Sequence, residues 1–308
     1  MSDSVGGRFL LPPLALYIHI PWCVRKCPYC DFNSHAAGPT LPEEEYVDAL
    51  LADLDIDLQH VHGRQLSSIF FGGGTPSLFS AAALGRLLAG VEQRIGFAAD
   101  IEITLEANPG TFEQAKFQAY RQLGINRLSI GVQSFQAAKL KALGRIHDGD
   151  EAIRAADMAR AAGFDNFNLD LMHGLPEQSI EDAVRDLAEF VSAAVQEYGI
   201  DASNIFATGF SNGANTAAAI MVRHPELLVG AALFGSTIPF AHVDRVDLTG
   251  KRIWLANGDQ DSYAPVDVSA RWVEQLVDFG AEVTWLRHSG GHQISQDHLR
   301  QIAEGLAS

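Results

Sequence analysis

The sequence has few cysteines, no long apolar run and few basic residues relative to its acidic ones. Its three cysteines all lie between Cys23 and Cys30, which is too few and too close for a disulfide framework. No stretch approaches the roughly 18 consecutive apolar residues of a membrane-spanning helix. We therefore expect a protein of a reducing compartment, the cytoplasm, without disulfides and without a membrane span.

The charge balance argues against a further class of partner. The formal net charge is −16, from 22 Lys and Arg against 38 Asp and Glu. Nucleic acids and anionic membranes are bound by basic surfaces, which this composition disfavours. The start of the chain does not fit a signal peptide, because Pro12 and Pro13 interrupt the apolar residues after Arg8. Small-molecule partners are favoured, and the oligomeric state is left open.

Short apolar segments alternate with amphipathic helical patterns along the chain. Hydrophobic residues make up 47% of 308 residues, enough for a sizeable core and for two domains. The alternation predicts an α/β fold with a mainly parallel sheet, in which polar groups gather at the carboxyl ends of the strands. The expected strands are 16–20, 68–71, 101–106, 127–132 and 166–171, followed by 204–210, 228–234, 252–256 and 282–287.

No linker rich in Gly, Ser or Pro separates the first five strands from the last four. The connection is instead a predicted helix over 180–198, with a capping box of Ser179 and Asp182 at its start and Gly199 at its end. The motifs before and after this helix belong to different chemistries. We therefore predict two domains, 1–185 and 186–308.

The cysteines are spaced as Cys23-Val-Arg-Lys-Cys27-Pro-Tyr-Cys30. Cysteine thiolates hold iron–sulfur clusters, and three thiolates leave one iron of a [4Fe-4S] cluster open to a small molecule. The alternative is a structural zinc ion, for which His19 or His35 would be the fourth ligand.

Residues 16–179 resemble the radical SAM proteins related to oxygen-independent coproporphyrinogen oxidase. The matching segments are Tyr17 to Cys30, Phe70 to Ser77, Leu105 to Gly110, Ser129 to Phe135, Leu143 to Arg145 and Asp170 to Pro176. The oxidase usually carries another cysteine at the position of Phe32. The heme-chaperone branch lacks that cysteine, as this chain does. The resemblance therefore points to that branch and to porphyrin metabolism.

The resemblance implies a set of binding residues and ligands. The cluster would be held by Cys23, Cys27 and Cys30, and S-adenosylmethionine would be bound by Tyr17, Gly73, Gly74, Thr75, Glu106, Gln133, Arg145 and Asp170. If the family's chemistry is retained, reduction generates a deoxyadenosyl radical. Chaperone-like members bind and transfer heme, so heme or a porphyrin is a further expected ligand. From the residues alone, the glycines are also compatible with a simple tight turn, and Arg145 and Asp170 with a buried ion pair.

A second constellation begins at Thr208-Gly-Phe-Ser211-Asn-Gly213. This Gly-x-Ser-x-Gly pattern lies between a predicted strand and a predicted helix, the context of a nucleophile elbow. Backbone N–H groups at the start of such a helix, here that of Asn212, stabilise an oxyanion.

Two partners for Ser211 follow in the order acid, histidine. Asp261, with Asp259 as the alternative, and His292 each come after a predicted strand. Residues 186–308 resemble the C-terminal part of α/β-hydrolases of the carboxylesterase and phospholipase type. Two further histidines of this region, His288 and His298, are expected at the surface.

Both resemblances are partial. The first stops after its fifth strand, and the second lacks its first strands together with the loop that normally supplies a second oxyanion donor. The chain combines a partial radical SAM barrel with a partial hydrolase sheet, as a natural fusion, an engineered chimera or an assembly artefact. The leading hypothesis is a radical SAM protein that binds S-adenosylmethionine at its cluster. The alternatives are a serine esterase using Ser211, His292 and Asp261, and a scaffold with neither activity.

Overall fold

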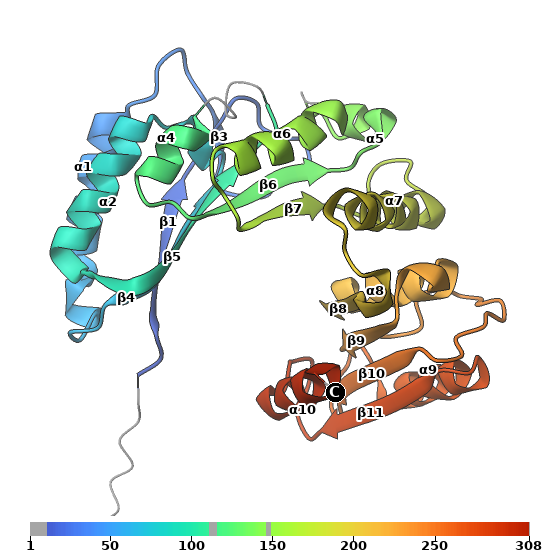
Figure 1. The fold of residues 1–308 in the computed structure, drawn as a ribbon. Helices are drawn as coiled ribbons and strands as arrows, with labels where there is room; N and C mark the ends of the chain where they lie inside the picture. The colour runs from blue at the N-terminus through green and yellow to red at the C-terminus, as the bar shows by residue number, and fades with distance from the viewer. Residues whose placement is uncertain (1–10, 111–115, 146–148, 308) are drawn as a thin grey trace, which may run out of the picture. The chain divides into compact units, whose positions relative to one another are not determined.

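A computed structural model of the chain describes residues 11–110, 116–145 and 149–307. The chain divides into two compact units, Met1–Gln178 (unit 1) and Ser179–Ser308 (unit 2). Each unit has its own parallel sheet, shown in Figure 1. Among the described strands, the last strand of unit 1 does not pair with the first strand of unit 2, so the two sheets are separate.

Unit 1 contains a five-stranded parallel sheet in the order β1-β4-β5-β6-β7. Its strands are β1 (Leu14–Ile20), β4 (Leu66–Gly73), β5 (Phe97–Ala107), β6 (Arg127–Gln133) and β7 (Phe167–Leu171), with two-residue strands β2 (Trp22–Cys23) and β3 (His35–Ala36) in the cysteine loop. Its helices are α1 (Glu43–Asp57), α2 (Ala81–Ile95), α4 (Phe117–Gln122), α5 (Ala137–Ala142) and α6 (Gly149–Ala161), with single 3₁₀ turns η1 (Leu58–His60) and η2 (Pro76–Leu78). Helices α1 and α2 lie side by side in Figure 1.

The two faces of the unit 1 sheet differ in character. Successive side chains of a strand point to opposite faces, so alternate residues form one face. The helix-covered face is apolar, and Ile69, Phe71 and Leu105 are at most 1% exposed. The opposite face carries polar side chains, among them Glu106 and Asp170. The strands end with these polar groups at their carboxyl ends.

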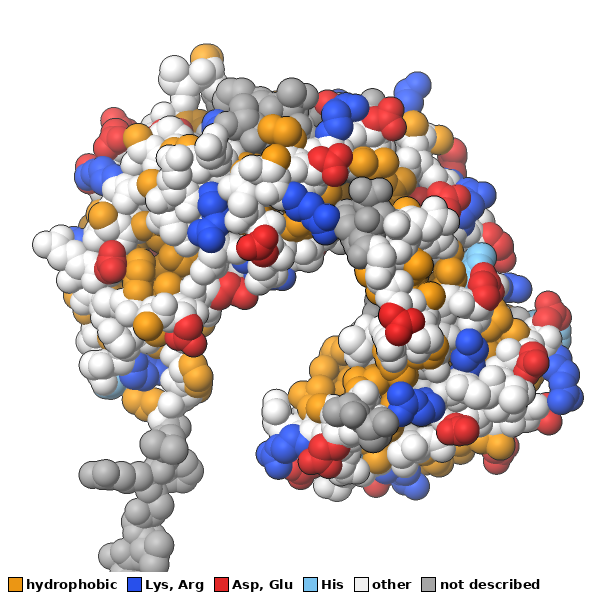
Figure 2. Space-filling model, in the orientation of Figure 1, with side chains coloured by type: hydrophobic (Ala, Val, Ile, Leu, Met, Phe, Trp, Pro, Cys, Tyr) orange, Lys and Arg blue, Asp and Glu red, His pale blue; other side chains and the backbone are white. Residues whose placement is uncertain are grey.

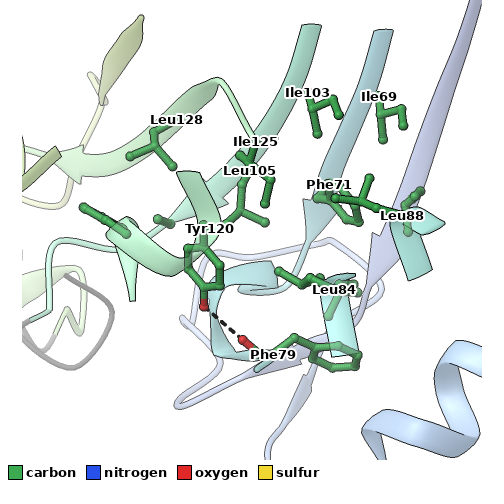
Figure 3. Close-up of a cluster of buried hydrophobic side chains, with 14 of the residues drawn as sticks. Ile69, Phe71, Phe79, Leu84, Leu88, Ile103, Leu105, Tyr120, Ile125 and Leu128 are labelled. Carbon is green, nitrogen blue, oxygen red and sulfur yellow. Dashed lines mark hydrogen bonds between the residues drawn. The ribbon is translucent and has the colours of Figure 1, made fainter. Parts of the chain in front are cut away.

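Figure 3 shows the core of unit 1, where aliphatic and aromatic side chains from β4, β5 and β6 pack against α2 and α4. The Tyr120 hydroxyl is buried there and donates hydrogen bonds to the carbonyl oxygens of Phe79 (2.9 Å) and Ser77 (2.6 Å). These bonds satisfy a buried polar group. They also tie α4 to the segment that follows the glycine turn of β4.

Unit 2 contains a four-stranded parallel sheet in the order β11-β10-β9-β8. Its strands are β8 (Phe206–Phe210), β9 (Gly230–Phe234), β10 (Arg252–Gly258) and β11 (Glu282–His288). Its helices are α7 (Ile180–Tyr198), α8 (Asn212–Arg223), α9 (Val266–Asp278) and α10 (Gln296–Ala307), with 3₁₀ turns η3 (Ala202–Asn204) and η4 (Pro225–Leu227). All nine strands expected from the sequence are present, so the predicted α/β fold is confirmed.

Both faces of the unit 2 sheet are covered, by different helices. Alternate residues of β10, such as Leu255, pack with α7, α8 and α9 in the larger core. The residues between them, such as Trp254, pack with Ile302 of α10 on the other face. Strand β8 is at the edge of this sheet, and Phe210 at its end is 37% exposed.

The capping predictions for α7 are confirmed. The Ser179 hydroxyl accepts a hydrogen bond from the Asp182 N–H, and the Asp182 carboxylate accepts one from the Ser179 N–H. Gly199 ends the helix in the left-handed conformation. The boundary between the compact units coincides with this cap, so α7 belongs entirely to unit 2.

Charged side chains of both signs are spread over the surface drawn in Figure 2. On the face drawn in Figure 2, acidic and basic side chains are interspersed over each unit, and no continuous basic field is visible there. Among the helices that the structure describes, none is both long enough and apolar enough to cross a membrane.

Candidate functional site

A cavity of about 220 Å³ lies at the carboxyl ends of the unit 1 strands. It brings together all three cysteines and seven of the eight residues predicted to bind the cofactor: Cys23, Cys27, Cys30, Gly73, Gly74, Thr75, Glu106, Gln133, Arg145 and Asp170. The eighth, Tyr17, is beside the lining, where its ring stacks on Phe70 and its hydroxyl is 3.2 Å from His19 Nδ1. The parallel strands thus collect residues that are far apart in the sequence.

The end of β4 makes room in this cavity because it has no side chains. Gly73 has a φ of +116°, and a Cβ there would lie 2.6 Å from the His19 ring. A Cβ on Gly74 would lie 2.6 Å from the carbonyl oxygen of Trp22. The sequence left open whether these glycines form a simple turn. The backbone contact at Gly74 shows that the segment entering the cysteine loop can pack here only against glycine.

Each cysteine sulfur is close to a side-chain donor. The Cys23 thiol forms hydrogen bonds with Thr75 and Ser34, which partly offset the rise in its pKa caused by burial. The Ser34 hydroxyl is also 3.7 Å from the Cys30 sulfur. The guanidinium of Arg145 is 3.7 Å from the Cys27 sulfur through Nη1. Donors of this kind stabilise thiolates that ligate metal ions.

Two carboxyl groups face the cavity in different electrostatic settings. Burial raises the pKa of Glu106. A hydrogen bond of 3.3 Å from the Gly73 N–H lowers this pKa, and the negative charge of nearby Asp170 raises it. The two oxygens of Asp170 are fixed by hydrogen bonds, from Ser129 (2.8 Å) and from Asn168 (2.6 Å). Asp170 is therefore oriented before any ligand binds.

The buried ion pair that the sequence left open is not formed. Arg145 donates through Nη2 to the Gly131 carbonyl at 2.7 Å and contacts the Cys27 sulfur, while Asp170 is held by Ser129 and Asn168. The Arg145 Nε is buried and has no hydrogen-bond partner among the described residues. A buried donor without an acceptor is costly, so this atom suits the carboxylate of a bound ligand.

The described residues around the cysteines bear on the zinc alternative. Within the described ranges, no three His, Cys, Asp or Glu side chains converge closely enough to bind a single metal ion. Zinc requires all its sulfur ligands at about 2.3 Å from one centre, whereas cluster ligands bind separate irons. Both ring nitrogens of His19 already have partners, Tyr17 and the Asn33 carbonyl.

The second constellation lies wholly in unit 2, at the end of β8. Ser211 has φ 55° and ψ −119°, the strained turn of a nucleophile elbow, and its N–H donates to the Phe234 carbonyl at 2.8 Å. Helix α8 begins at the next residue, so the Asn212 N–H is among the unpaired donors of a helix start. A Cβ on Gly209 would lie 2.3 Å from the Gly213 carbonyl carbon, which explains the first glycine of the motif.

The acid and the histidine are joined as the sequence predicted. His292 Nδ1 is 2.7 Å from Asp261 Oδ2, and Asp261 is 5% exposed. Burial raises the pKa of Asp261, but hydrogen bonds from the Ala264 and Tyr263 N–H groups and from His292 hold it below its usual value. The alternative acid, Asp259, instead pairs with Arg287 at 2.7 Å.

The serine and the histidine are near each other without being bonded. The Ser211 N–H donates to the carbonyl oxygen of Phe234. The next residue, Gly235, is close to His292, because a Cβ on Gly235 would lie 2.8 Å from the His292 ring. Among the described hydrogen bonds, none joins the Ser211 hydroxyl to His292. Catalytic contacts of this kind are often loose until substrate binds. The exposed rings of Phe210 and Tyr263 flank the His292 ring at 4.7 and 5.0 Å.

Sequence reasoning missed several supporting residues and misplaced one histidine. Ser129, Asn168 and Asn108 were not predicted as site residues, although Ser129 and Asn108 lie in matched segments and Asn168 is two residues before Asp170 on its strand. The surface prediction for His298 is wrong. It is 6% exposed, and its ring is 5.4 Å from that of His288, because α10 packs it against the sheet.

Two family models match the chain. Residues 17–190 match the radical SAM superfamily, and residues 149–308 match the phospholipase/carboxylesterase family. The heme chaperone HemW of Escherichia coli (strain K12) is 59% identical over 181 residues, covering 59% of this chain and 48% of the relative. HemW of Haemophilus influenzae is 55% identical over 185 residues, with the same coverage. The chain thus spans about half the length of the curated relatives it matches.

Two solved structures are similar to parts of the chain. Coproporphyrinogen III oxidase (HemN) from Escherichia coli, described as a radical SAM enzyme, is 33% identical with a TM-score of 0.54, covering 58% of this chain and 42% of that one. A Bacillus cereus carboxylesterase is 29% identical with a TM-score of 0.41, covering 44% of this chain and 65% of that one. By its family matches, the chain belongs to the radical SAM superfamily over residues 17–190 and to the phospholipase/carboxylesterase family over residues 149–308.

Proposed function

We propose that unit 1 holds a [4Fe-4S] cluster on Cys23, Cys27 and Cys30 and binds S-adenosylmethionine in the adjoining cavity. The observation that carries this proposal is the convergence of the three cysteines and seven predicted cofactor residues on one cavity. When bound, the cluster supplies the electron for cleavage of S-adenosylmethionine.

The chain's own residues have separate tasks in this proposal. Gly73 and Gly74 line the cavity without side chains of their own, and the unpaired Arg145 Nε offers a charged donor to the carboxylate of the ligand. Glu106 and Asp170 offer acceptors to amino and hydroxyl groups. The cysteine loop lines one side of the cavity.

Anaerobic reconstitution tests the proposal. The wild-type protein should take up about four irons, absorb broadly in the visible region and then bind S-adenosylmethionine in calorimetry. The Cys27→Ala variant should lose the absorption. Absence of iron uptake by the wild-type protein would refute the proposal. The relatives' name, heme chaperone, supports heme as a second ligand of this chain, and a shift of the heme absorption maximum on adding hemin tests that extension.

We also propose serine hydrolase activity in unit 2 as a second candidate function. The hydrogen bond between His292 and Asp261, together with the positive φ of Ser211, favours it. In this reaction His292 would accept the Ser211 hydroxyl proton, Asp261 would orient the imidazole, and the Asn212 N–H would bind the oxyanion. With one identifiable oxyanion donor, the rate should be about 10²–10³ lower than with two.

A fluorophosphonate probe separates this function from the first. It should label the wild-type chain and the Cys27→Ala variant equally, and it should not label Ser211→Ala. Equal labelling of wild type and Ser211→Ala would refute a serine nucleophile. If both the probe and the iron reconstitution fail, the chain is a scaffold without either activity.

A further inference from the structure

Arg145 is held against one cysteine of the candidate cluster site by an anchor on the sheet. Its Nη2 donates to the Gly131 carbonyl of β6 at 2.7 Å, and its Nη1 is 3.7 Å from the Cys27 sulfur. A Cβ on Gly131 would lie 2.8 Å from Nη2, so only glycine leaves space for this position. The guanidinium is thus fixed by the fold and does not depend on a bound ligand for its place.

Cys27 has a second donor in the same loop. The Tyr29 hydroxyl forms a hydrogen bond with the Cys27 thiol, and Tyr29 lines the same cavity. A tyrosine hydroxyl carries its proton at neutral pH, so it can donate to a thiolate. Cys27 therefore lies between a permanent cation and a neutral donor.

The other two sulfurs have a different environment. Cys23 and Cys30 meet the hydroxyl groups of Ser34 and, for Cys23, of Thr75. Among the sulfur contacts that the structure describes, only that of Cys27 is with a permanently charged group, the Arg145 guanidinium. An arginine keeps its charge at any pH that proteins tolerate, so this asymmetry is constant.

We propose that Arg145, assisted by Tyr29, sets the reducibility of the cluster by acting on the Cys27 sulfur, in addition to any contact with the cofactor. One-electron reduction adds negative charge to the cluster and its thiolates. A fixed cation and hydrogen bonds to a ligand sulfur stabilise the reduced form and raise its reduction potential. The inference rests on the proposed function, because it requires a cluster on Cys27.

The test is a redox titration of the reconstituted full-length protein, followed by EPR without S-adenosylmethionine. In Arg145→Gln, the equilibrium constant for one-electron reduction should fall about tenfold, which is about 59 mV for one electron. Arg145→Lys should recover most of this loss, because it restores the charge. Tyr29→Phe should lower the same equilibrium constant about threefold. The effect is smaller than that of Arg145→Gln because a neutral donor is removed and not a charge.

Arg154→Gln is the matched control. Arg154 is an exposed arginine of α6 in the same unit, and it does not line the cavity. Its removal changes the net charge equally and should alter the equilibrium less than about twofold, because an exposed charge is screened by solvent. A shift as large as that of Arg145→Gln would mean that net charge alone is responsible and would overturn the inference.

The remaining outcomes are also decisive. Full iron content with an unchanged potential in Arg145→Gln would overturn the inference and leave the proposed function standing. If Arg145→Gln fails to hold iron, the reduction potentials of Arg145→Lys and Tyr29→Phe are compared with that of the wild-type protein. An unchanged potential in Tyr29→Phe then overturns the inference. Failure of the wild-type protein to take up iron would refute the proposed function and the inference together.

Discussion

The backbone at Ser211 provides a direct test of the elbow. Its φ of 55° and ψ of −119° lie outside the regions favoured by residues with a Cβ. Holding such a residue there costs on the order of 1–3 kcal/mol. Glycine removes the strain, although its freedom in the unfolded chain costs about 0.5–1 kcal/mol relative to alanine. We therefore expect Ser211→Gly to be about 1 kcal/mol more stable than Ser211→Ala.

Comparing these two variants isolates the backbone, because both lack the hydroxyl. Three of the four tryptophans, Trp254, Trp272 and Trp285, are in unit 2, so fluorescence during urea unfolding mainly reports that unit. For a unit of this size, 1 kcal/mol corresponds to a shift of about 4 °C in thermal midpoint.

Thr216 in α8 supplies a control of opposite sign. At this ordinary helical position, Thr216→Gly should be about 1 kcal/mol less stable than Thr216→Ala. If Ser211→Gly is also less stable than Ser211→Ala, the backbone at Ser211 is not strained and the structural basis for the elbow is refuted.

Four further predictions concern other contacts. Burial raises the pKa of Asp261, but hydrogen bonds hold this pKa below its unfolded value. The carboxylate therefore stabilises unit 2 above about pH 4, and this contribution is lost as the pH falls through the folded pKa. Asp261→Asn should lose that part of the pH dependence in urea titrations, and an unchanged profile would contradict the assignment. Gly74→Ala would place a Cβ 2.6 Å from a carbonyl oxygen and should destabilise unit 1 by at least about 1–3 kcal/mol, whereas Gly38→Ala, with its nearest atom at 3.7 Å, should stay within about 0.5 kcal/mol in the same denaturation assay. Tyr120→Phe should cost about 1–2 kcal/mol because it removes a buried donor from two carbonyl groups, and a smaller loss would mean that water replaces it. Asn168→Ala should weaken S-adenosylmethionine binding about fivefold in calorimetry, because it frees one oxygen of the carboxylate that it orients, and an equal affinity would exclude that role.

Much of the fold follows from local sequence. Strand periodicity places the residues around Leu105 and Leu255 in cores, and the cap at Ser179 fixes the start of α7. These signals lie within a few residues of one another, so they can be read without knowing the tertiary structure. The motif spacing likewise places the cysteines, the elbow serine and the polar strand ends at the edges of sheets.

Other parts depend on contacts between distant residues. His298 lies on a polar stretch that suggests a surface position, but α10 packs it against the sheet. The choice of Asp261 over Asp259 depends on Arg287, which is remote in sequence and occupies the second acid. The contact between Arg145 and Cys27 joins residues 118 positions apart.

The sequence by itself determined that the chain carries two kinds of motif, because residue type and spacing define each one: three cysteines at Cys23, Cys27 and Cys30, and a serine elbow followed by an acid and a histidine. Only the tertiary structure decided how these residues are placed. It separated the strands into two sheets, chose the partner of His292, and turned Arg145 from a possible partner of Asp170 toward a cysteine sulfur. The physical reason is that hydrogen bonds and charge contacts act over a few ångströms, and packing alone brings distant segments within that range.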